Sequence, residues 1–202
     1  MTGIISPPFS AQSKIHIRKT VLHDSGVIVF PTDTYYALGC SALCSKAVKK
    51  IYRLKSRSTA QPLLILIDSW EMFGRYVDSV PDSRMQAMQK YWPGSLTAIF
   101  TVNQQLAKEL NYQSNEVAIR MTPNPITRDL ISICGVPLVG TSANQSDHPP
   151  TADVEGAIRS FSHEVDLYID GGKTRGGMPS TIIRFSKEDK MELVRKGATK
   201  IG

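Results

Sequence analysis

The chain has 202 residues, 41 % of them hydrophobic and 21 % charged, and a net charge of +6 from 24 Lys and Arg against 18 Asp and Glu. This composition is that of an ordinary soluble protein, and the length fits one domain that buries roughly 70 % of its unfolded surface. No apolar run reaches the ~18 residues of a membrane span, and the N-terminus lacks the apolar core of a signal peptide. We therefore expect a single domain over residues 1–202, located in the cytoplasm, with no membrane partner.

The excess positive charge favours an anionic partner such as a nucleotide or an RNA. It is concentrated in one part of the chain, because no carboxylate lies between Asp33 and Asp68, whereas six Lys and Arg residues do. The three cysteines are expected to be free, buried thiols, since no second Cys pair or His pair completes a zinc site. They are Cys40, Cys44 and Cys134.

Helices are predicted where apolar residues recur every three or four positions. One begins at Ser45, which can cap it, and ends before Lys55; its apolar residues Val48, Ile51 and Tyr52 share one face. The charged residues of this helix are expected to form a solvated outer face: Lys46, Lys49, Lys50 and Arg53. The other predicted helices span residues 10–24, 69–76, 82–91, 125–133 and 153–161.

Strands are predicted for short apolar or β-branched runs that are bounded by turn residues. Residues 27–30 form a continuous apolar run, which is typical of a strand buried on both faces. Because predicted strands outnumber clear βαβ crossovers, we expect an α/β fold with a twisted, mixed sheet flanked by helices. The predicted strands span residues 27–30, 63–67, 96–102, 117–120, 136–139, 165–169, 180–185 and 191–195.

Polar loops follow two of these strands at their carboxyl ends, where open α/β sheets bind ligands. Residues 140–144 form one such loop, and Thr32, Asp33 and Thr34 follow the strand at 27–30, which is broken at Pro31. An alternative for Thr32 and Asp33 is that they shape the turn, since Asp can hydrogen-bond its own loop backbone. The hydroxyl groups of these loops could bind one end of a ligand.

Cations follow the helix that begins at Ser45. Lys55 and Arg57 lie just past its end and could meet the hydroxyl-rich loops in a site for a phosphorylated ligand; stabilisation of the helix dipole is the alternative. Arg120, at the end of a predicted strand, is a candidate anion ligand or else part of a surface salt bridge.

Residues 171–174, Gly-Gly-Lys-Thr, look like the end of a phosphate-binding P-loop. The first glycine of that motif would fall at Leu167, inside a predicted strand, and no Gly-x-Gly-x-x-Gly is present. The chain therefore contains neither of the standard nucleotide-binding loops, and Lys173 is left without an assigned role.

Nine short motifs nevertheless occur in one order along the chain. The sequence resembles the YrdC-like threonylcarbamoyl-AMP synthase family over nearly its whole length. The motifs are Pro-Thr-Asp-Thr-Tyr at 31–35, Ala-Leu-Gly at 37–39, Lys-Ser-Arg at 55–57, Pro-Gly-Ser-Leu-Thr at 93–97, Ala-Ile-Arg at 118–120, Thr-Ser-Ala-Asn at 141–144, Asp-Gly-Gly at 170–172, Ser-Thr-Ile at 180–182 and Val-Arg-Lys-Gly at 194–197.

The resemblance implies an α/β fold with a deep, positively charged concave surface. It also implies a reaction of L-threonine, bicarbonate and ATP, with Mg²⁺, that yields threonylcarbamoyl-AMP and pyrophosphate. A threonylcarbamoyl-transferase complex would then modify tRNA, which the chain would meet directly or through that complex. Because negative charge builds up on the phosphates, such an enzyme needs chiefly cations and accurate positioning.

The resemblance also implies roles for individual residues, and it assigns none of them to a metal. The catalytic residues would be Lys55, Arg57, Ser142 and Asn144. L-Threonine would be bound by Thr34, Arg120 and Ser180. ATP would be bound by Thr32, Arg57, Thr141, Ser142, Asn144 and Arg195.

The chain departs from the family pattern at several positions. Ala37 stands where members often have Gly, and Ser146 is followed by Asp147 rather than Gly, so that an acid and then His148 lie near a polyanion site. The predicted strand at 63–67 lacks the His that some members have there. The chain ends soon after Arg195, as expected for the short, single-domain form.

Two other functions are compatible with these observations. One is a paralogue that acts on another carbamoyl or acyl substrate. The other is a non-catalytic module that binds double-stranded RNA or tRNA through Lys46, Lys49 and Lys50, with an affinity that falls steeply with salt.

Overall fold

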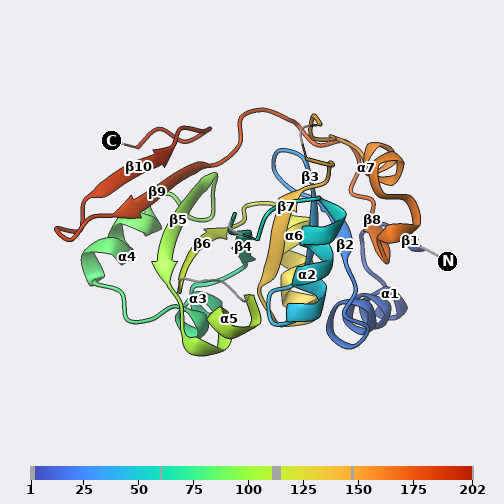
Figure 1. The fold of residues 1–202 in the computed structure, drawn as a ribbon, viewed down its shortest axis with the longest axis horizontal. Coiled ribbons are helices and arrows are strands. Elements are labelled where there is room, and N and C mark those ends of the chain that lie inside the picture. The colour runs from blue at the N-terminus through green and yellow to red at the C-terminus, as the bar shows by residue number, and fades with distance from the viewer. Residues whose placement is uncertain (1–2, 60, 111–114, 147, 202) are drawn as a thin grey trace.

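The computed structural model describes residues 3–59, 61–110, 115–146 and 148–201. Within these residues, ten strands form one sheet in the order β1-β8-β2-β3-β7-β4-β6-β5-β9-β10 (Figure 1). Four neighbouring pairs are parallel (β1–β8, β8–β2, β4–β6 and β5–β9) and the others are antiparallel. The predicted mixed sheet is confirmed. The strands are β1 (Gly3–Ile5), β2 (Ile28–Pro31), β3 (Tyr36–Ser41), β4 (Leu64–Ile67), β5 (Leu96–Thr101), β6 (Glu116–Met121), β7 (Leu138–Ser142), β8 (Leu167–Ile169), β9 (Thr181–Phe185) and β10 (Met191–Arg195).

Helices cover this sheet. The helix α2 packs on β3 and against α5, α6 packs on β2 and β4 and against α1, and α7 packs on β2 and β8. None of the helices within the described residues is long and apolar enough to cross a membrane. The α-helices are α1 (Ala11–Arg18), α2 (Ser45–Leu54), α3 (Trp70–Tyr76), α4 (Asp82–Gln89), α5 (Gln104–Leu110), α6 (Pro125–Cys134) and α7 (Val154–Phe161), with a π-helical turn at Lys19–His23 and a 3₁₀ turn at Ser162–Glu164.

Capping side chains explain where most of these helices begin. The side chains of Ser10, Ser69, Asn124 and Asp153 each accept a hydrogen bond from a backbone N–H in the first turn. The predicted cap at Ser45 is wrong. Ser45 is the first residue of α2, after an N-cap residue without a side-chain cap.

The strand β3 was not predicted, although it lies in the middle of the sheet. All six of its residues are buried, so it lacks the alternation of apolar and polar residues that marks a half-exposed strand. The strand β1 and the helix α5 were also not predicted. The strand β7 extends to Ser142, and residues 140–142, which the sequence placed in a loop, therefore belong to the sheet.

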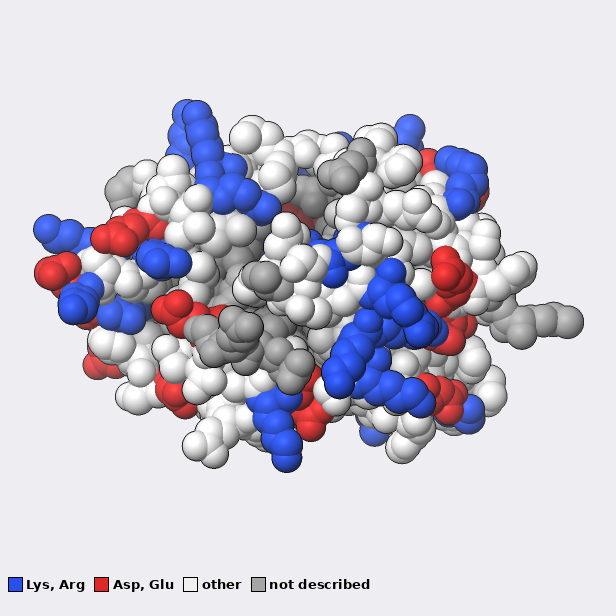
Figure 2. Space-filling model, viewed as in Figure 1, with Lys and Arg blue, Asp and Glu red and all other residues white. Residues whose placement is uncertain are grey.

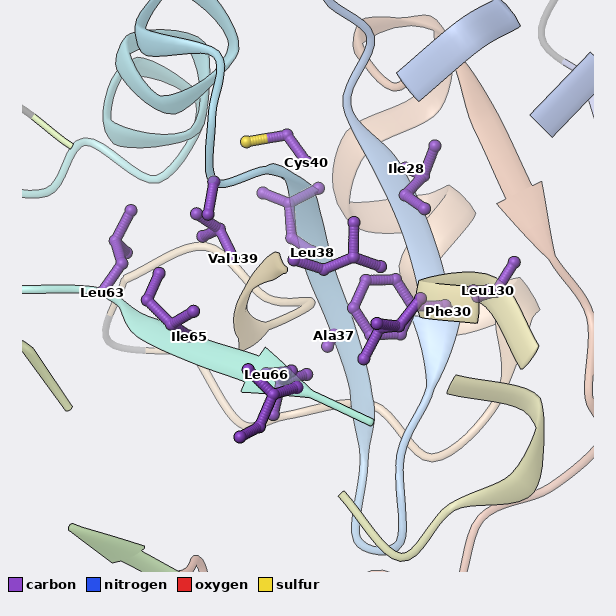
Figure 3. Close-up of a cluster of buried hydrophobic side chains, with 14 of the residues drawn as sticks. Ile28, Phe30, Ala37, Leu38, Cys40, Leu63, Ile65, Leu66, Leu130 and Val139 are labelled. Carbon is purple, nitrogen blue, oxygen red and sulfur yellow. The ribbon is translucent and has the colours of Figure 1, made fainter. Parts of the chain in front are cut away.

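The core is continuous across the sheet, and its centre lies between β2, β3 and β7. Ile28 and Phe30 on one face of the sheet, and Leu38 and Val139 on the other, are fully buried there (Figure 3). Every residue of β2 is buried, as its apolar run predicts. Cys40 and Cys134 are buried and Cys44 is half-buried, all three as free thiols.

Candidate active site

A cavity of about 460 Å³ opens on one face of the central strands. The strand register explains why these residues meet. Leu66 pairs with Arg120 between β4 and β6, and Thr97 pairs with Ile182 between β5 and β9. Directly paired residues point to the same side of a sheet, so the floor of the cavity is built from alternate residues of several strands.

Small side chains leave room for this cavity. On β3 and β7 the floor consists of Ala37 and Gly140, and on β6 it includes Ala118. A Cβ atom at position 140 would lie 2.7 Å from the Leu66 side chain, so the glycine lets Leu66 lie across β7. Ala37, which stands where members of the family often have Gly, is therefore a residue of the cavity floor.

The turn between β2 and β3 forms one wall of the cavity. The Thr32 hydroxyl donates to the Tyr35 carbonyl at 2.7 Å and accepts from the Thr34 N–H at 3.2 Å. Thr32 thus shapes the turn while it lines the cavity, and Thr34 is half-buried beside it. The alternative that the turn residues serve the turn itself is confirmed for Thr32.

Asp33 behaves differently, because its side chain binds a distant arginine rather than its own loop. Its Oδ2 atom accepts from Arg120 Nη2 at 2.5 Å and from the Ser95 hydroxyl at 2.8 Å. Arg120 is only 5 % exposed. Arg120 therefore does form the salt bridge that was the alternative to anion binding, but the pair is largely buried at the cavity rather than on the outer surface, since the Asp33 side chain is 19 % exposed and both partners line the cavity.

Lys55 joins the end of α2 to the end of β7. Its Nζ donates to the carbonyl oxygens of Ser142 and Asn144, both at 2.6 Å, and the residue is 4 % exposed. Burial, and then the positive charge of Arg57, lower the pKa of Lys55 to about 8. Lys55 holds the backbone of the Thr-Ser-Ala-Asn motif and does not line the cavity.

Asn144 also lies behind the cavity wall. Its Nδ2 donates to the carbonyl oxygens of Gln145 and His148, at 2.9 and 2.5 Å, and its Oδ1 is buried without a partner among the described residues. These bonds tie Asn144 to the backbone of Gln145 and His148, and the Ser146 hydroxyl donates to the Lys55 carbonyl at the end of α2 at 2.5 Å. His148 is exposed, and the predicted effect of Asp147 lies outside the described residues.

Arg57 and Arg195 supply the other cations of the cavity lining. Arg57 is half-buried and donates from Nη2 to the Pro62 carbonyl at 3.1 Å. Arg195 donates from Nη2 to the Ser180 carbonyl at 2.8 Å. Within the part of the chain that the structure describes, neither arginine has a carboxylate partner, so both positive charges are uncompensated.

The connection from β8 to β9 passes over this region and contacts the β2–β3 turn (Figure 1). Gly176 N–H donates to the Thr34 carbonyl at 2.7 Å, and Gly177 N–H donates to the Tyr35 hydroxyl at 3.3 Å. Both glycines have positive φ angles, 67° and 106°, which disfavour other residues. The glycine-rich run that resembles a P-loop thus leads into a segment that covers one side of the cavity.

The structure brings most of the predicted site residues together. The predicted residues that line the cavity are Thr32, Thr34, Arg57, Arg120, Thr141, Ser142, Ser180 and Arg195. Lys55 and Asn144 lie behind the lining instead. Ala118 and Ile182 were missed, although each lies two residues along a strand from a predicted residue, and strand alternation could have found them.

The described residues contain no group of three or more His, Cys, Asp or Glu side chains that could hold a metal ion.

Comparison with known proteins places these features in context. A sequence profile of the Sua5/YciO/YrdC family, described as "Telomere recombination", matches residues 20–197. The chain is 32 % identical to the threonylcarbamoyl-AMP synthase of Pyrococcus abyssi over 174 residues, 86 % of this chain and 51 % of the relative. It is 31 % identical to that of Marinobacter nauticus over 167 residues, 82 % of this chain and 87 % of the relative.

Solved structures agree with this result. The structure of P. abyssi Sua5 complexed with L-threonine superposes with a TM-score of 0.87 at 28 % identity, covering 98 % of this chain and 57 % of that one. E. coli YciO superposes with a TM-score of 0.83 at 25 % identity, covering 99 % of this chain and 97 % of that one. The chain spans about half the length of the P. abyssi synthase and also of the Bacillus subtilis synthase, to which it is 32 % identical.

Proposed function

The chain belongs to the Sua5/YciO/YrdC family, and on this premise we propose that it is an L-threonylcarbamoyladenylate synthase. It would form threonylcarbamoyl-AMP and pyrophosphate from L-threonine, bicarbonate and ATP, for the threonylcarbamoyladenosine modification of tRNA. The observation that carries the proposal is the single cavity in which Arg57, Arg120 and Arg195 lie with the hydroxyl groups of Thr34 and Ser180.

The chemistry requires two bond-forming steps. The amine of L-threonine attacks the carbon of bicarbonate, water leaves, and a carbamate forms. A carbamate oxygen then attacks the α-phosphorus of ATP, the bond to the bridging oxygen breaks, and pyrophosphate leaves. Negative charge grows on the phosphate oxygens in the second step, so fixed cations lower its barrier.

The roles of the residues follow from their charges. Arg57 and Arg195, which lack carboxylate partners among the described residues, would hold phosphate groups, together with the hydroxyl groups of Thr141 and Ser142. Arg120, Thr34 and Ser180 would hold L-threonine. Lys55 would act mainly through the loop that it holds, since its Nζ is bonded to two backbone carbonyls.

We further propose that Mg²⁺ enters with ATP. Among the described residues that line the cavity, Asp33 is the one acid and is paired with Arg120, and Mg²⁺ is commonly held by substrate phosphates and water. The tRNA would be reached directly or through a threonylcarbamoyl-transferase complex, and the cytoplasmic location stays a prediction from the sequence.

Pyrophosphate release from ATP, measured with and without L-threonine and bicarbonate, tests the proposal. Release that requires both compounds is the expected result. Binding of ATP without threonine-dependent release would instead indicate a paralogue with another carbamoyl or acyl substrate.

A non-catalytic RNA-binding module is the second candidate function. It is favoured by the exposed cations on the outer face of α2, which are Lys46, Lys49 and Arg53 and over which Lys and Arg gather in Figure 2. Absence of ATP binding, together with salt-sensitive RNA binding, would support this candidate over the synthase.

A further inference from the structure

We propose that Asp33, Ser95 and the carbonyl group of Gly94 form a positioning network that holds Arg120 ready for the carboxylate of the amino-acid substrate. The inference rests on the proposed function and adds to it the residues that orient this arginine. Asp33 acts through Arg120 and is therefore a positioning residue, not a catalytic one.

The network occupies most of the guanidinium group. Arg120 Nε donates to the Gly94 carbonyl at 2.7 Å, and Nη2 lies 2.5 Å from Asp33 Oδ2 and 3.2 Å from Ser95 Oγ. Among the described residues, Nη1 makes no hydrogen bond. Its two N–H groups remain for a ligand, and an oxygen atom of a substrate carboxylate can accept from one of them in a charge-assisted hydrogen bond.

The network joins three segments that lie far apart in the sequence. Asp33 belongs to the β2–β3 turn, Gly94 and Ser95 to the turn before β5, and Arg120 to β6. Gly94 cannot be replaced easily, because a Cβ atom there would lie 2.1 Å from the Tyr91 carbonyl oxygen. The network thus gives a role to the Pro-Gly-Ser turn, which does not itself line the cavity.

The network also divides the cavity by charge. Asp33 compensates the charge of Arg120, whereas Arg57 and Arg195 have no carboxylate partner among the described residues. A triphosphate is attracted to the uncompensated arginines and repelled by Asp33. A small zwitterion with one carboxylate suits the Arg120 side, because it brings little net charge to the ion pair.

One feature of Asp33 is hard to explain by stability alone. Its Oδ1 atom is buried and has no partner among the described residues, and leaving a carboxylate oxygen unpaired opposes folding. Buried ion pairs often stabilise a fold no better than apolar residues of the same size would. The presence of this ion pair is explained if Asp33 serves to orient Arg120 for the substrate.

Steady-state kinetics of the full chain test the inference through two variants. Asp33→Asn weakens the bond to Arg120 while it keeps the size of the side chain, and the KM for L-threonine is expected to rise about tenfold or more. Ser95→Ala removes one hydroxyl group and should raise that KM by about three- to tenfold. In both variants the KM for ATP should stay within about twofold of the wild-type value, because the phosphates bind elsewhere.

The chain provides a matched control. Asp189 also accepts from an arginine and a serine hydroxyl, Arg84 and Ser83, and Arg84 also donates to a backbone carbonyl; none of these residues lines the cavity. Asp189→Asn should leave both KM values unchanged. The inference is overturned if Asp33→Asn and Ser95→Ala leave the KM for L-threonine within about twofold, or raise the KM for ATP equally.

Direct titration with L-threonine separates this inference from the proposed reaction. A wild-type protein that binds L-threonine more tightly than Asp33→Asn but releases no pyrophosphate would refute the reaction and support the network. Normal turnover with an unchanged KM in both variants would refute the network alone. If Asp33→Asn does not fold, as a thermal melt would show, Ser95→Ala decides, and a wild-type protein that binds no L-threonine refutes both.

Discussion

Arg57 carries an uncompensated positive charge in the cavity, and its side chain makes few contacts that stabilise the fold. Its side chain is half-buried and bonds the Pro62 carbonyl, so Arg57→Ala should shift the melting temperature by only a few degrees. Loss of a cation that stabilises charge on the phosphates should lower the rate of threonine-dependent pyrophosphate release by about 10²-fold or more. Arg53→Ala, at an exposed position on α2 shortly before Arg57, is the control. Full turnover in Arg57→Ala would show that the site assignment is wrong.

Lys55 gives the stability of the protein a measurable pH dependence. Burial lowers its pKa from 10.5 to about 8 in the folded protein. Between these values the unfolded chain binds more protons at this position than the folded protein does, so the free energy of unfolding rises with pH. Lys55→Met should abolish this rise, which amounts to about 1 kcal/mol between about pH 7.5 and 9.

Urea denaturation of the wild type and of Lys55→Met at several pH values measures the effect. Burial raises the pKa of the Cys40 and Cys134 thiols, which makes stability fall with pH above about 9. That contribution is common to both proteins and cancels in their difference. Lys49→Met, at an exposed position on α2, should follow the wild type, and parallel profiles for Lys55→Met and the wild type would contradict the assignment.

At this scale the sequence predicts which residues meet but not which atoms bind. The hydroxyl and arginine residues that were predicted for the site do line the cavity. The sequence could not show that Lys55 bonds two backbone carbonyls or that Asp33 pairs with Arg120, since each contact joins segments 87 or more residues apart. Side-chain roles of this kind depend on the register of the whole sheet.

Among the structural elements, β3 depends on a single glycine. A Cβ atom at Gly39 would lie 2.1 Å from the Val139 carbonyl oxygen and 2.6 Å from the Phe30 ring. Gly39→Ala should therefore force β3 away from β2 and β7 and lower the free energy of unfolding by about 2–3 kcal/mol.

Gly74 in α3 is exposed, and no atom would lie within 4 Å of a Cβ atom there, so Gly74→Ala should raise the free energy of unfolding by about 0.5–1 kcal/mol. Urea denaturation of both variants checks these opposite signs, and a stable Gly39→Ala would refute the close packing.

The same strand shows why part of the fold could not be predicted. Residues 36–41 contain small and polar side chains between the apolar ones, and both faces of the strand are covered. No alternation results, and β7, one of the two strands that pair with β3, comes about 100 residues later. In contrast, the helix at α2 was predicted well, because Val48, Ile51 and Tyr52 repeat with the helical period and are buried.

At the scale of the whole molecule, the positive charge occurs in two places with different surroundings. Arg57, Arg120 and Arg195 line the cavity on one face of the sheet, where Arg120 is buried, Arg57 is half-buried and Arg195 is exposed. The outer face of α2 carries Lys46, Lys49 and Arg53 in solvent (Figure 2), while Lys50 on the same helix is paired with Asp166 at 2.6 Å. The predicted solvated face is confirmed for Lys46, Lys49 and Arg53 but not for Lys50, and it is separate from the cavity lining.

This separation leads to a prediction for the variant with Lys46→Gln, Lys49→Gln and Arg53→Gln, which lowers the net charge from +6 to +3 (6 − 3). Charges on a solvated face act on a distant ligand mainly through long-range attraction, which salt screens beyond about 8 Å at 0.15 M ionic strength. The variant should keep the wild-type kcat and KM for L-threonine, and its KM for ATP should rise by at most about threefold, and only at low salt. Pyrophosphate-release assays at two ionic strengths measure kcat and both KM values.

A large loss of turnover at physiological salt would show that the outer face of α2 takes part in the reaction. A selective loss of RNA affinity would instead identify this face as the surface that binds tRNA.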